Sequence, residues 1–170
     1  SIWTNYPGFT IYYGDIINSN ASISLDFPGS GYLWIAPLME HPYTPTKAIL
    51  GGGGINSGNH LVELTIMGNQ IIANELEYNF SGTISAMEYS PIDPLYRYVL
   101  TENGKFYYSL DDGENWTMTS SFTGPGSHYF YGSTIWASQE ELGKVFIGGS
   151  GYSNSPVYVS ENHGQSFSTM

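Results

Sequence analysis

Aromatic and histidine side chains gather on polar segments in the second half of the chain. His128, Tyr129 and Tyr131 stand close together, and Tyr152 follows in another segment rich in Gly and Ser. Flat rings with a polar edge stack on sugar rings or anchor a protein partner. We therefore expect these four residues to face a glycan or protein ligand. The alternative is that the rings fill the space between packed sheets.

Carboxylates are the other groups that could do chemistry. Hydrolysis of a glycosidic bond needs two of them facing each other across a cleft, about 5 to 9.5 Å apart. The acidic residues that could supply such a pair include Asp15, Glu40, Glu63, Glu88 and Glu102. None has neighbours that single it out, and a solvated strand or loop carboxylate explains each one. The sequence therefore assigns no catalytic residue.

Metal and cofactor sites are not indicated. The histidines, His41, His60, His128 and His163, lack metal-ligand spacing, and the chain contains no cysteine. The run Gly51-Gly-Gly-Gly54 leads into another strand-like segment rather than a helix, so it predicts a loop and not a phosphate cradle. We expect neither a metal nor a cofactor.

Charge and composition limit the classes of molecule that the chain could bind. Four basic side chains stand against 15 acidic ones, a formal net charge of -11. Nucleic acid and anionic membrane surfaces are therefore disfavoured, and no apolar run predicts membrane insertion. The sequence starts at Ser1 without a basic-then-apolar segment, which indicates a chain already trimmed. Abundant Gly and Tyr with few charges are typical of exported bacterial β-proteins, so we expect a secreted or cell-surface location.

The elements that must position these residues read as short strands. Helical patterning is almost absent, and β-rich runs alternate with Gly, Pro, Asn and Asp. The runs are 31–36, 48–50, 60–66, 83–89, 96–100, 106–109, 133–137, 145–147 and 157–159, with 9–13 and 21–25 before them. The sequence predicts an all-β chain with tight connections.

The strand runs recur with a period near fifty residues. In the clearest pair, Ser109, Gly113 and Trp116 match Ser160, Gly164 and Phe167 at a constant offset of 51 residues. A third copy, 64–71, keeps only a glycine and a following apolar residue. Four strands in a period of this length are the signature of β-propeller blades.

The pattern Ser109-x-Asp111-x-Gly113-x-x-Trp116 resembles the Asp-box, or BNR repeat. This motif occurs in sialidases, sortilin-type receptors, family 74 glycoside hydrolases and photosystem-assembly-factor-like propellers. The resemblance implies a hairpin turn between the third and fourth strands of a blade, on the face away from the ligand pocket. The residues given this structural role are Ser109, Asp111, Gly113, Trp116, Ser160, Asn162, Gly164 and Phe167.

Physically, such a turn needs acceptors for its backbone N–H groups. The Ser hydroxyl and Asp carboxylate supply them, and Gly113 supplies a positive φ. Trp116 then buries its ring behind the turn. In the second copy, Asn162 can still accept one bond and Phe167 replaces the Trp.

We therefore expect about three and a half blades of a larger propeller. Outer strands of a preceding blade occupy 1–31, a blade with a decayed Asp-box 32–82, a blade with a full Asp-box 83–130, and a blade with a variant Asp-box 131–170. The missing blades would come from the rest of the same polypeptide or from a second copy.

Two functions stay open. The first is a non-catalytic binding or scaffolding segment that contacts a glycan or protein through its loops. The alternative is a segment of an extracellular glycoside hydrolase acting on neutral polysaccharide. A sialidase site is excluded because it needs three arginines to clamp a carboxylate and this chain has only Arg97, for which we expect a surface stacking or ion-pair role. A sorting receptor of the sortilin type would need cysteine-rich domains, and none is present in the sequence.

Overall fold

All the regular structure in the described residues is β-strand. The computed structural model describes residues 2–5, 8–13, 21–26, 33, 36–52, 59–68, 70–125, 133–149 and 155–170. The strands are β1 (Ile2–Asn5), β2 (Gly8–Tyr13), β3 (Ala21–Asp26), β4 (Leu38–Glu40), β5 (Lys47–Gly51), β6 (Leu61–Met67), β7 (Gln70–Glu75), β8 (Ile84–Tyr89), β9 (Arg97–Thr101), β10 (Phe106–Ser109), β11 (Thr117–Met118), β12 (Thr134–Ala137), β13 (Val145–Gly148), β14 (Val157–Ser160) and β15 (Ser168–Thr169). No helix long and apolar enough to cross a bilayer occurs among these residues.

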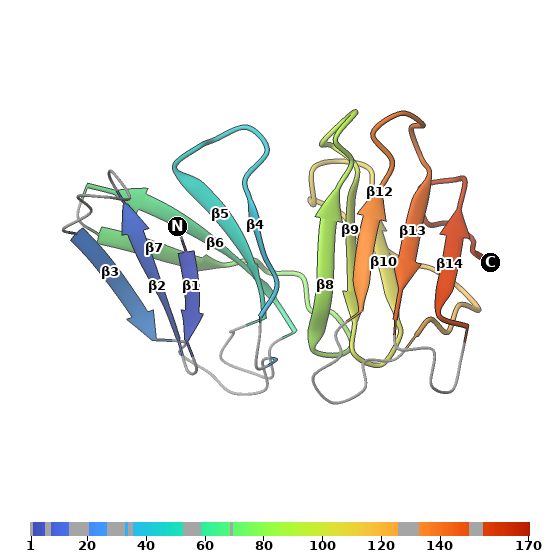
Figure 1. Cartoon of the computed structure of the whole chain (residues 1–170), viewed down its shortest axis with the longest axis horizontal. Coiled ribbons are helices and arrows are strands. Elements are labelled where there is room, and N and C mark those ends of the chain that lie inside the picture. The colour runs from blue at the N-terminus through green and yellow to red at the C-terminus, as the bar shows by residue number, and fades with distance from the viewer. Residues whose placement is uncertain are drawn as a thin grey trace.

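The strands form four antiparallel sheets that follow one another along the chain (Figure 1). The first sheet has three strands, β1-β2-β3. The second (β4–β7), third (β8–β11) and fourth (β12–β15) sheets have four strands each, and in each of them sequential strands are neighbours. Each four-stranded sheet is therefore a meander, the layout that the repeat predicts.

The second sheet differs from expectation at both edges. A strand is expected over 31–36, of which the structure describes only Leu33 and Ala36. Both lie outside any strand, and the edge strand begins at Leu38. Pro37 has no N–H to donate, so the strand begins only after it. At the other edge, β6 and β7 pair up to Met67 and Gln70 around Gly68, which has a φ of 60°.

Apolar side chains fill the two junctions between consecutive four-stranded sheets. Between the second and third sheets lie Ile49, Leu61, Phe80, Ile84, Val99 and Tyr107. Between the third and fourth lie Ala86, Tyr98, Leu100, Phe106, Phe122, Ile135, Ala137, Val145, Ile147 and Tyr158. Successive side chains along a strand point to opposite faces of the sheet. The third sheet lies between two others and is therefore apolar on both faces.

The loops divide between two ends of the sheets. At one end the Asp112 N–H, in the β10–β11 turn, donates to the Leu95 carbonyl in the β8–β9 loop. In the fourth sheet the His163 N–H, in the β14–β15 turn, donates to the Gly143 carbonyl in the β12–β13 loop. We call this the motif end. At the other end Glu102 N–H bonds to the Thr83 carbonyl, and Gly124 N–H bonds to the Gly104 carbonyl. We call this the loop end, because the connections between successive sheets pass here.

Candidate functional site

The turn from Ser109 to Trp116 is held by two side chains. The buried Ser109 hydroxyl accepts the Gly113 N–H at 2.9 Å and the Asp111 N–H at 3.3 Å, and donates to Asp111 Oδ1 at 2.8 Å. Asp111 in turn accepts the backbone N–H and the side-chain amide of Asn115 at 2.9 and 2.7 Å. These bonds from Asn115 and Ser109 lower the pKa of Asp111. The carboxylate is thus engaged as an acceptor inside its own turn.

The turn from Ser160 to Phe167 has the same geometry. Ser160 Oγ accepts the Gly164 N–H at 2.8 Å, and Asn162 Oδ1 accepts the Ser166 N–H at 3.0 Å. Asn162 uses its amide N–H to reach Ser166 Oγ at 2.9 Å, a bond that a carboxylate could not donate. An asparagine can therefore replace the aspartate and leave the turn closed.

Replacing Ser109 by Ala should destabilise the protein by about 1 to 3 kcal/mol, because two N–H groups of a buried turn lose their acceptor. Ser160→Ala should cost a similar amount. Equilibrium urea unfolding measures both, with the exposed Ser120→Ala as the control that should change stability by less than about 0.5 kcal/mol. Equal stabilities for all three variants would contradict the role of the hydroxyls.

Each motif aromatic packs against a phenylalanine from the preceding connection. The Trp116 ring lies 5.1 Å from the Phe80 ring in an edge-to-face arrangement, and the Phe167 ring stacks on Phe122 at 4.4 Å. Both motif rings are half-buried at the junctions rather than enclosed within their own sheets. The turns therefore join neighbouring sheets as well as neighbouring strands.

Arg97 is buried, which corrects the surface role expected from the sequence. Its side chain in β9 is 6% exposed and forms an ion pair with Asp112 in the motif turn of the same sheet. Asp112 has a φ of 63°, and this left-handed backbone directs the carboxylate toward the arginine strand. The ion-pair part of the expectation holds, but the partner and the burial were not visible in the sequence.

His163 occupies the same turn position as Asp112 but reaches across the junction. Its φ is 59°, its ring stacks on Tyr96 at 4.1 Å, and its Nδ1 lies 3.3 Å from the Tyr98 hydroxyl. Burial lowers the pKa of His163, against the opposing charge of Asp93. The neutral imidazole is thus the form that fits between the third and fourth sheets.

This pKa direction predicts a loss of stability in mild acid. Because the folded-state pKa of His163 lies below the ordinary value of about 6.5, its contribution is full above that pH and falls as pH drops through the folded-state pKa. His163→Asn keeps a side chain that tolerates the left-handed backbone. Urea unfolding between pH 7.5 and pH 5 should show a smaller acid loss for the variant, and identical pH profiles would contradict the prediction. His41 titrates in the same direction in both proteins, since burial, followed by the charge of Arg97, lowers its pKa.

The loop end is where the sequence places a ligand. The four candidates, His128, Tyr129, Tyr131 and Tyr152, all lie outside the described residues. Their ligand role therefore stays a prediction. The described loop-end residues show how the other connections at this end are held.

Short polar bonds tie the connections together at the loop end. The Asn103 amide donates to the Ser81 carbonyl at 2.7 Å, and Glu102 accepts the Thr83 hydroxyl at 2.9 Å. Asn59 donates to Asn79 at 2.6 Å. These side chains bind other loops of the chain. They form a fixed base rather than a set of free ligand groups.

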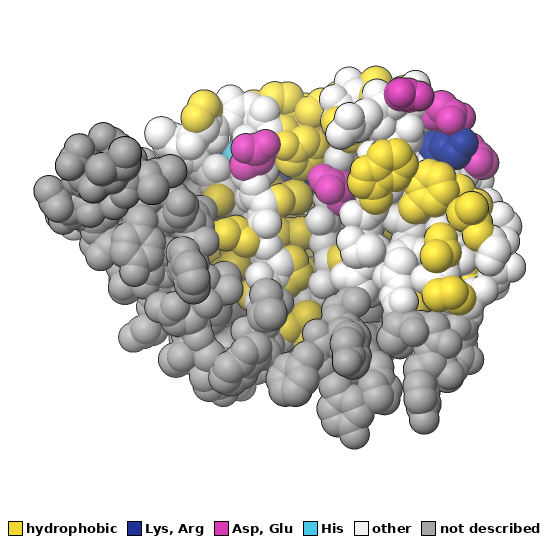
Figure 2. Space-filling model, in the orientation of Figure 1, with side chains coloured by type: hydrophobic (Ala, Val, Ile, Leu, Met, Phe, Trp, Pro, Cys, Tyr) yellow, Lys and Arg dark blue, Asp and Glu magenta, His cyan; other side chains and the backbone are white. Residues whose placement is uncertain are grey.

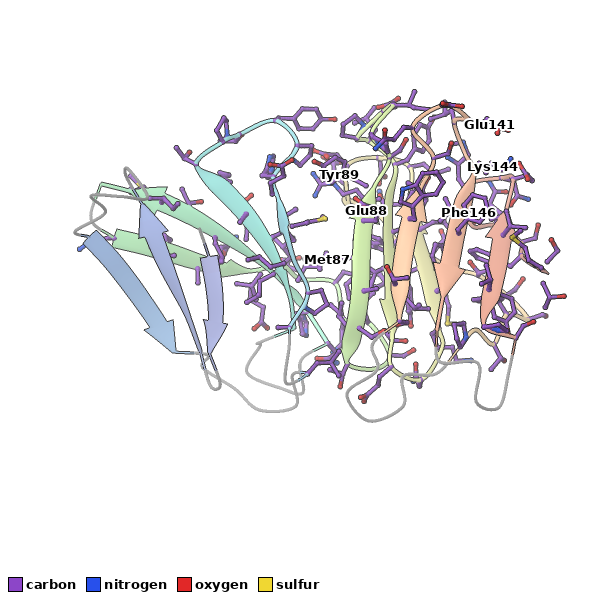
Figure 3. The ribbon with its side chains drawn as sticks, in the orientation of Figure 1. Met87, Glu88, Tyr89, Glu141, Lys144 and Phe146 are labelled. Atoms are coloured by element: carbon purple, nitrogen blue, oxygen red, sulfur yellow. The ribbon has the colours of Figure 1, made fainter. Side chains whose placement is uncertain are left out.

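Three of the carboxylates weighed as a hydrolytic pair, Glu63, Glu88 and Glu102, lie in different parts of the fold. Glu63 bonds to Lys47 at 2.8 Å on the second sheet, and Glu102 is at the loop end. Glu88 lies on β8 between Met87 and Tyr89, toward the motif end (Figure 3). Burial raises its pKa, while a bond from the Tyr89 N–H opposes the shift. Asp15 is outside the described residues.

Glu40 and Tyr89 connect the edge strands of the second and third sheets. The Tyr89 hydroxyl donates to Glu40 Oε1 at 3.4 Å. His60, by contrast, lies at the loop end with Nδ1 2.9 Å from the Leu76 carbonyl and 3.8 Å from Glu75. No group of three or more His, Cys, Asp or Glu side chains is placed to hold a metal ion in the described part of the chain.

Comparison with solved structures reveals the architecture. A GH74 enzyme from Niastella koreensis superimposes with a TM-score of 0.64 over 98% of this chain, at 17% sequence identity. The fold is a β-propeller. A GH74 xyloglucanase from Xanthomonas campestris matches with a TM-score of 0.55 over 99% of the chain at 12% identity, and YCF48 bound to D1 peptide with 0.52 over 99% at 12%. No family model and no curated protein sequence matches the chain.

The propeller chain spans only part of these structures. It covers 27% of the Niastella chain, 29% of the Xanthomonas chain and 45% of YCF48. The sheets described above therefore correspond to blades of a larger propeller, and the all-β prediction is confirmed. What the sequence did not reveal is the pairing of Arg97 with Asp112 and of Tyr96 with His163. The sequence signal that could have pointed to these two side chains is the alignment of the motif copies, which puts Asp112 and His163 at the same position of the turn.

Proposed function

We propose that this propeller segment is a non-catalytic binding or scaffolding module whose loop end contacts a glycan or a protein. The observation that carries the proposal is the set of bonds at that end. Asn103, Glu102 and Asn59 bond to neighbouring connections and fix the base of the loops. A loop end whose described connections are fixed by such bonds suits recognition, because little order has to be gained on binding.

Similar structures supply the ligand classes to test. One is described as a xyloglucanase and another as bound to a peptide, and these properties belong to those proteins. Binding of a neutral xyloglucan oligosaccharide and of a peptide panel to the native polypeptide should be measured by calorimetry. We expect Tyr129→Ala and Tyr152→Ala to weaken binding at least tenfold, with Tyr43→Ala, at an exposed tyrosine between β4 and β5, as the control. Unchanged affinity in both loop variants would reject the loop end as the contact surface.

A glycoside hydrolase segment is the second candidate, and the likeness to GH74 enzymes favours it. Release of reducing ends from xyloglucan would establish it. Glu88→Gln and Glu40→Gln test whether this segment contributes, since both carboxylates lie on the edge strands β8 and β4. We expect no turnover. If the native protein does release reducing ends, and if the rate falls at least a hundredfold in either variant, the hydrolase function replaces the binding function.

We further propose that the remaining blades come from the same polypeptide or from a second copy, and that the protein is secreted or displayed on a bacterial surface. The partial coverage of the similar structures supports the first point, and the composition supports the second. The native mass compared with 18.7 kDa distinguishes the two sources of blades. Detection in the culture medium or at the cell surface tests the location.

A further inference from the structure

The motif end of the third sheet exposes three apolar side chains. Ile92 and Leu95, in the β8–β9 loop, are 43% and 45% exposed, and Leu110, in the motif turn, is 46% exposed. The bond from the Asp112 N–H to the Leu95 carbonyl holds that turn against the loop. We call Ile92, Leu95 and Leu110 the apolar tips. Exposed apolar side chains are common on protein surfaces, so exposure alone does not mark a contact surface.

The β12–β13 loop of the fourth sheet has the same backbone scaffold as the β8–β9 loop. Each loop begins with a serine whose N–H donates to the carbonyl of the sixth residue after it. That sixth residue donates its N–H to the carbonyl of the third residue after the serine, whose own N–H donates to the serine hydroxyl. The equivalent pairs are Ser90 and Ser138, Asp93 and Glu141, and Tyr96 and Lys144. The two loops can therefore be compared residue by residue.

The fold does not require apolar residues at the tips. In the fourth sheet the equivalent residues are two glutamates and a glycine, although the loop and the motif turn keep the same bonds. The equivalent pairs are Ile92 and Glu140, Leu95 and Gly143, and Leu110 and Glu161. Pro94 is matched by another apolar residue, Leu142, so that position is not counted among the tips. A group of exposed apolar side chains that folding does not demand is typical of a protein contact surface.

The loop that carries two of the tips is held in one conformation. Asp93 Oδ1 accepts the Leu95 N–H at 3.2 Å. Pro91 and Pro94 restrict the backbone on either side of Ile92 and Asp93. An apolar side chain on such a fixed loop loses little conformational freedom when a partner binds, which favours contact.

Carboxylates outnumber basic side chains at the motif end. Asp112 pairs with Arg97, and Lys144 bonds to Glu141 at 2.9 Å and lies 3.7 Å from Glu161. Figure 2 shows acidic side chains gathered around a basic one at the upper right, where Figure 3 labels Glu141 and Lys144. The carboxylates left without an ion pair among the described residues include Asp93, Asp111, Glu114 and Glu140. This end of the sheets therefore attracts positive charge.

The chain itself has no basic segment to match this surface. It holds four Lys and Arg residues in all. Lys47, Arg97 and Lys144 pair with carboxylates of their own sheets, and Lys105 is a single residue at the loop end. A second copy would bring a net charge of -11 toward an acidic surface. A matching partner is therefore a different molecule.

We propose that the apolar tips dock a separate protein, through a segment in which apolar side chains are flanked by lysine or arginine. The tips lie at the opposite end of the sheets from the loop end, so this inference does not rest on the ligand proposed there. A propeller segment with a contact surface at each end would hold two molecules together.

The test is fluorescence anisotropy with three labelled peptides of equal length, each added to the native polypeptide. The first peptide combines leucine with lysine, the second serine with lysine, and the third leucine with glutamate. We expect the leucine–lysine peptide to bind at least tenfold more tightly than the other two, because it alone offers apolar contact and positive charge together. Its binding should weaken as the salt concentration rises.

Ile92→Gln and Leu110→Gln give the third sheet side chains shaped like the glutamates of the fourth sheet, without adding charge. Both variants should therefore keep the fold and the urea midpoint of the native protein. Each should weaken binding of the leucine–lysine peptide at least fivefold. The control is Ile72→Gln, at an exposed isoleucine on the outer strand β7, which should change binding less than twofold.

Hydroxyl-radical oxidation of the native polypeptide shows whether the tips are free. Ile92 should oxidise about as fast as Ile72, since the two side chains are 43% and 48% exposed. The leucine–lysine peptide should protect Ile92 and leave Ile72 reactive. Slow oxidation of Ile92 without any peptide would show that another part of the polypeptide covers the tips, and would overturn the proposal.

Other outcomes would also overturn it. Equal binding of the serine–lysine peptide would show attraction by charge alone, and unchanged binding in both tip variants would place the peptide elsewhere. A dimer that Ile92→Gln dissociates would assign the tips to a second copy. Loss of peptide binding in Tyr129→Ala and Tyr152→Ala, but not in the tip variants, would move the contact to the loop end and leave the proposed function standing.

Discussion

Gly164→Ala should destabilise the protein by about 3 to 5 kcal/mol, a large part of the stability of a typical domain. A Cβ on Gly164 would lie 2.2 Å from Cε1 of Phe106, and the residue has a φ of 81°. Phe106 is fully buried among aromatic rings of the third and fourth sheets and has no room to retreat. The substitution therefore adds a steric clash to the backbone strain.

Gly68→Ala is the matched control for this prediction. Gly68 has a φ of 60° but nothing within 4 Å of its hypothetical Cβ. Its replacement should cost only the left-handed strain, about 1 to 2 kcal/mol. Equilibrium urea unfolding of both variants separates strain from clash. Similar losses in the two variants would show that the second motif turn is not packed against Phe106.

Phe80→Ala should cost about 3 to 5 kcal/mol, the range for a large buried ring replaced by a methyl group. Phe80 is completely buried and meets the rings of Tyr78, Tyr107 and Trp116 at 4.8, 5.1 and 5.1 Å. Its removal opens a cavity at the junction of the second and third sheets.

The measurement is again urea unfolding, with Ile92→Ala as the control at an exposed apolar side chain. That control should change stability by less than about 0.5 kcal/mol. Unfolding in two separate transitions would show that Phe80 is what couples the two sheets. A loss below 1 kcal/mol would contradict the packing described for this junction.

Sequence reasoning reaches furthest where local chemistry decides the structure. Ser109 and Gly113 specify a turn through hydrogen bonds and φ, and neither depends on distant residues. It failed where partners come from another element. Arg97 looked like a surface residue because its ion-pair partner Asp112 lies on the turn that follows the neighbouring strand β10.

The candidate site was harder to predict than the fold for the same reason. Glu102 had no sequence neighbour that singled it out, yet Glu102 and its neighbour Asn103 bond to Thr83 and Ser81 in the preceding connection. Only the spatial order of the sheets brings these segments together. In β9 all five residues, Arg97 to Thr101, are buried, so this strand packs on both faces.

The outermost strands of the four-stranded sheets differ in length, and this difference bears on self-assembly. The edge strands β11 and β15 have two residues each, so they offer a neighbouring molecule few unpaired N–H and C=O groups. β7 has six residues and exposes Ile72. Long, uncovered edges recruit strands from other molecules. Among these three outer edges β7 is the longest, and β3 of the first sheet contacts it, so aggregation of a concentrated sample should begin at β7 where that contact opens.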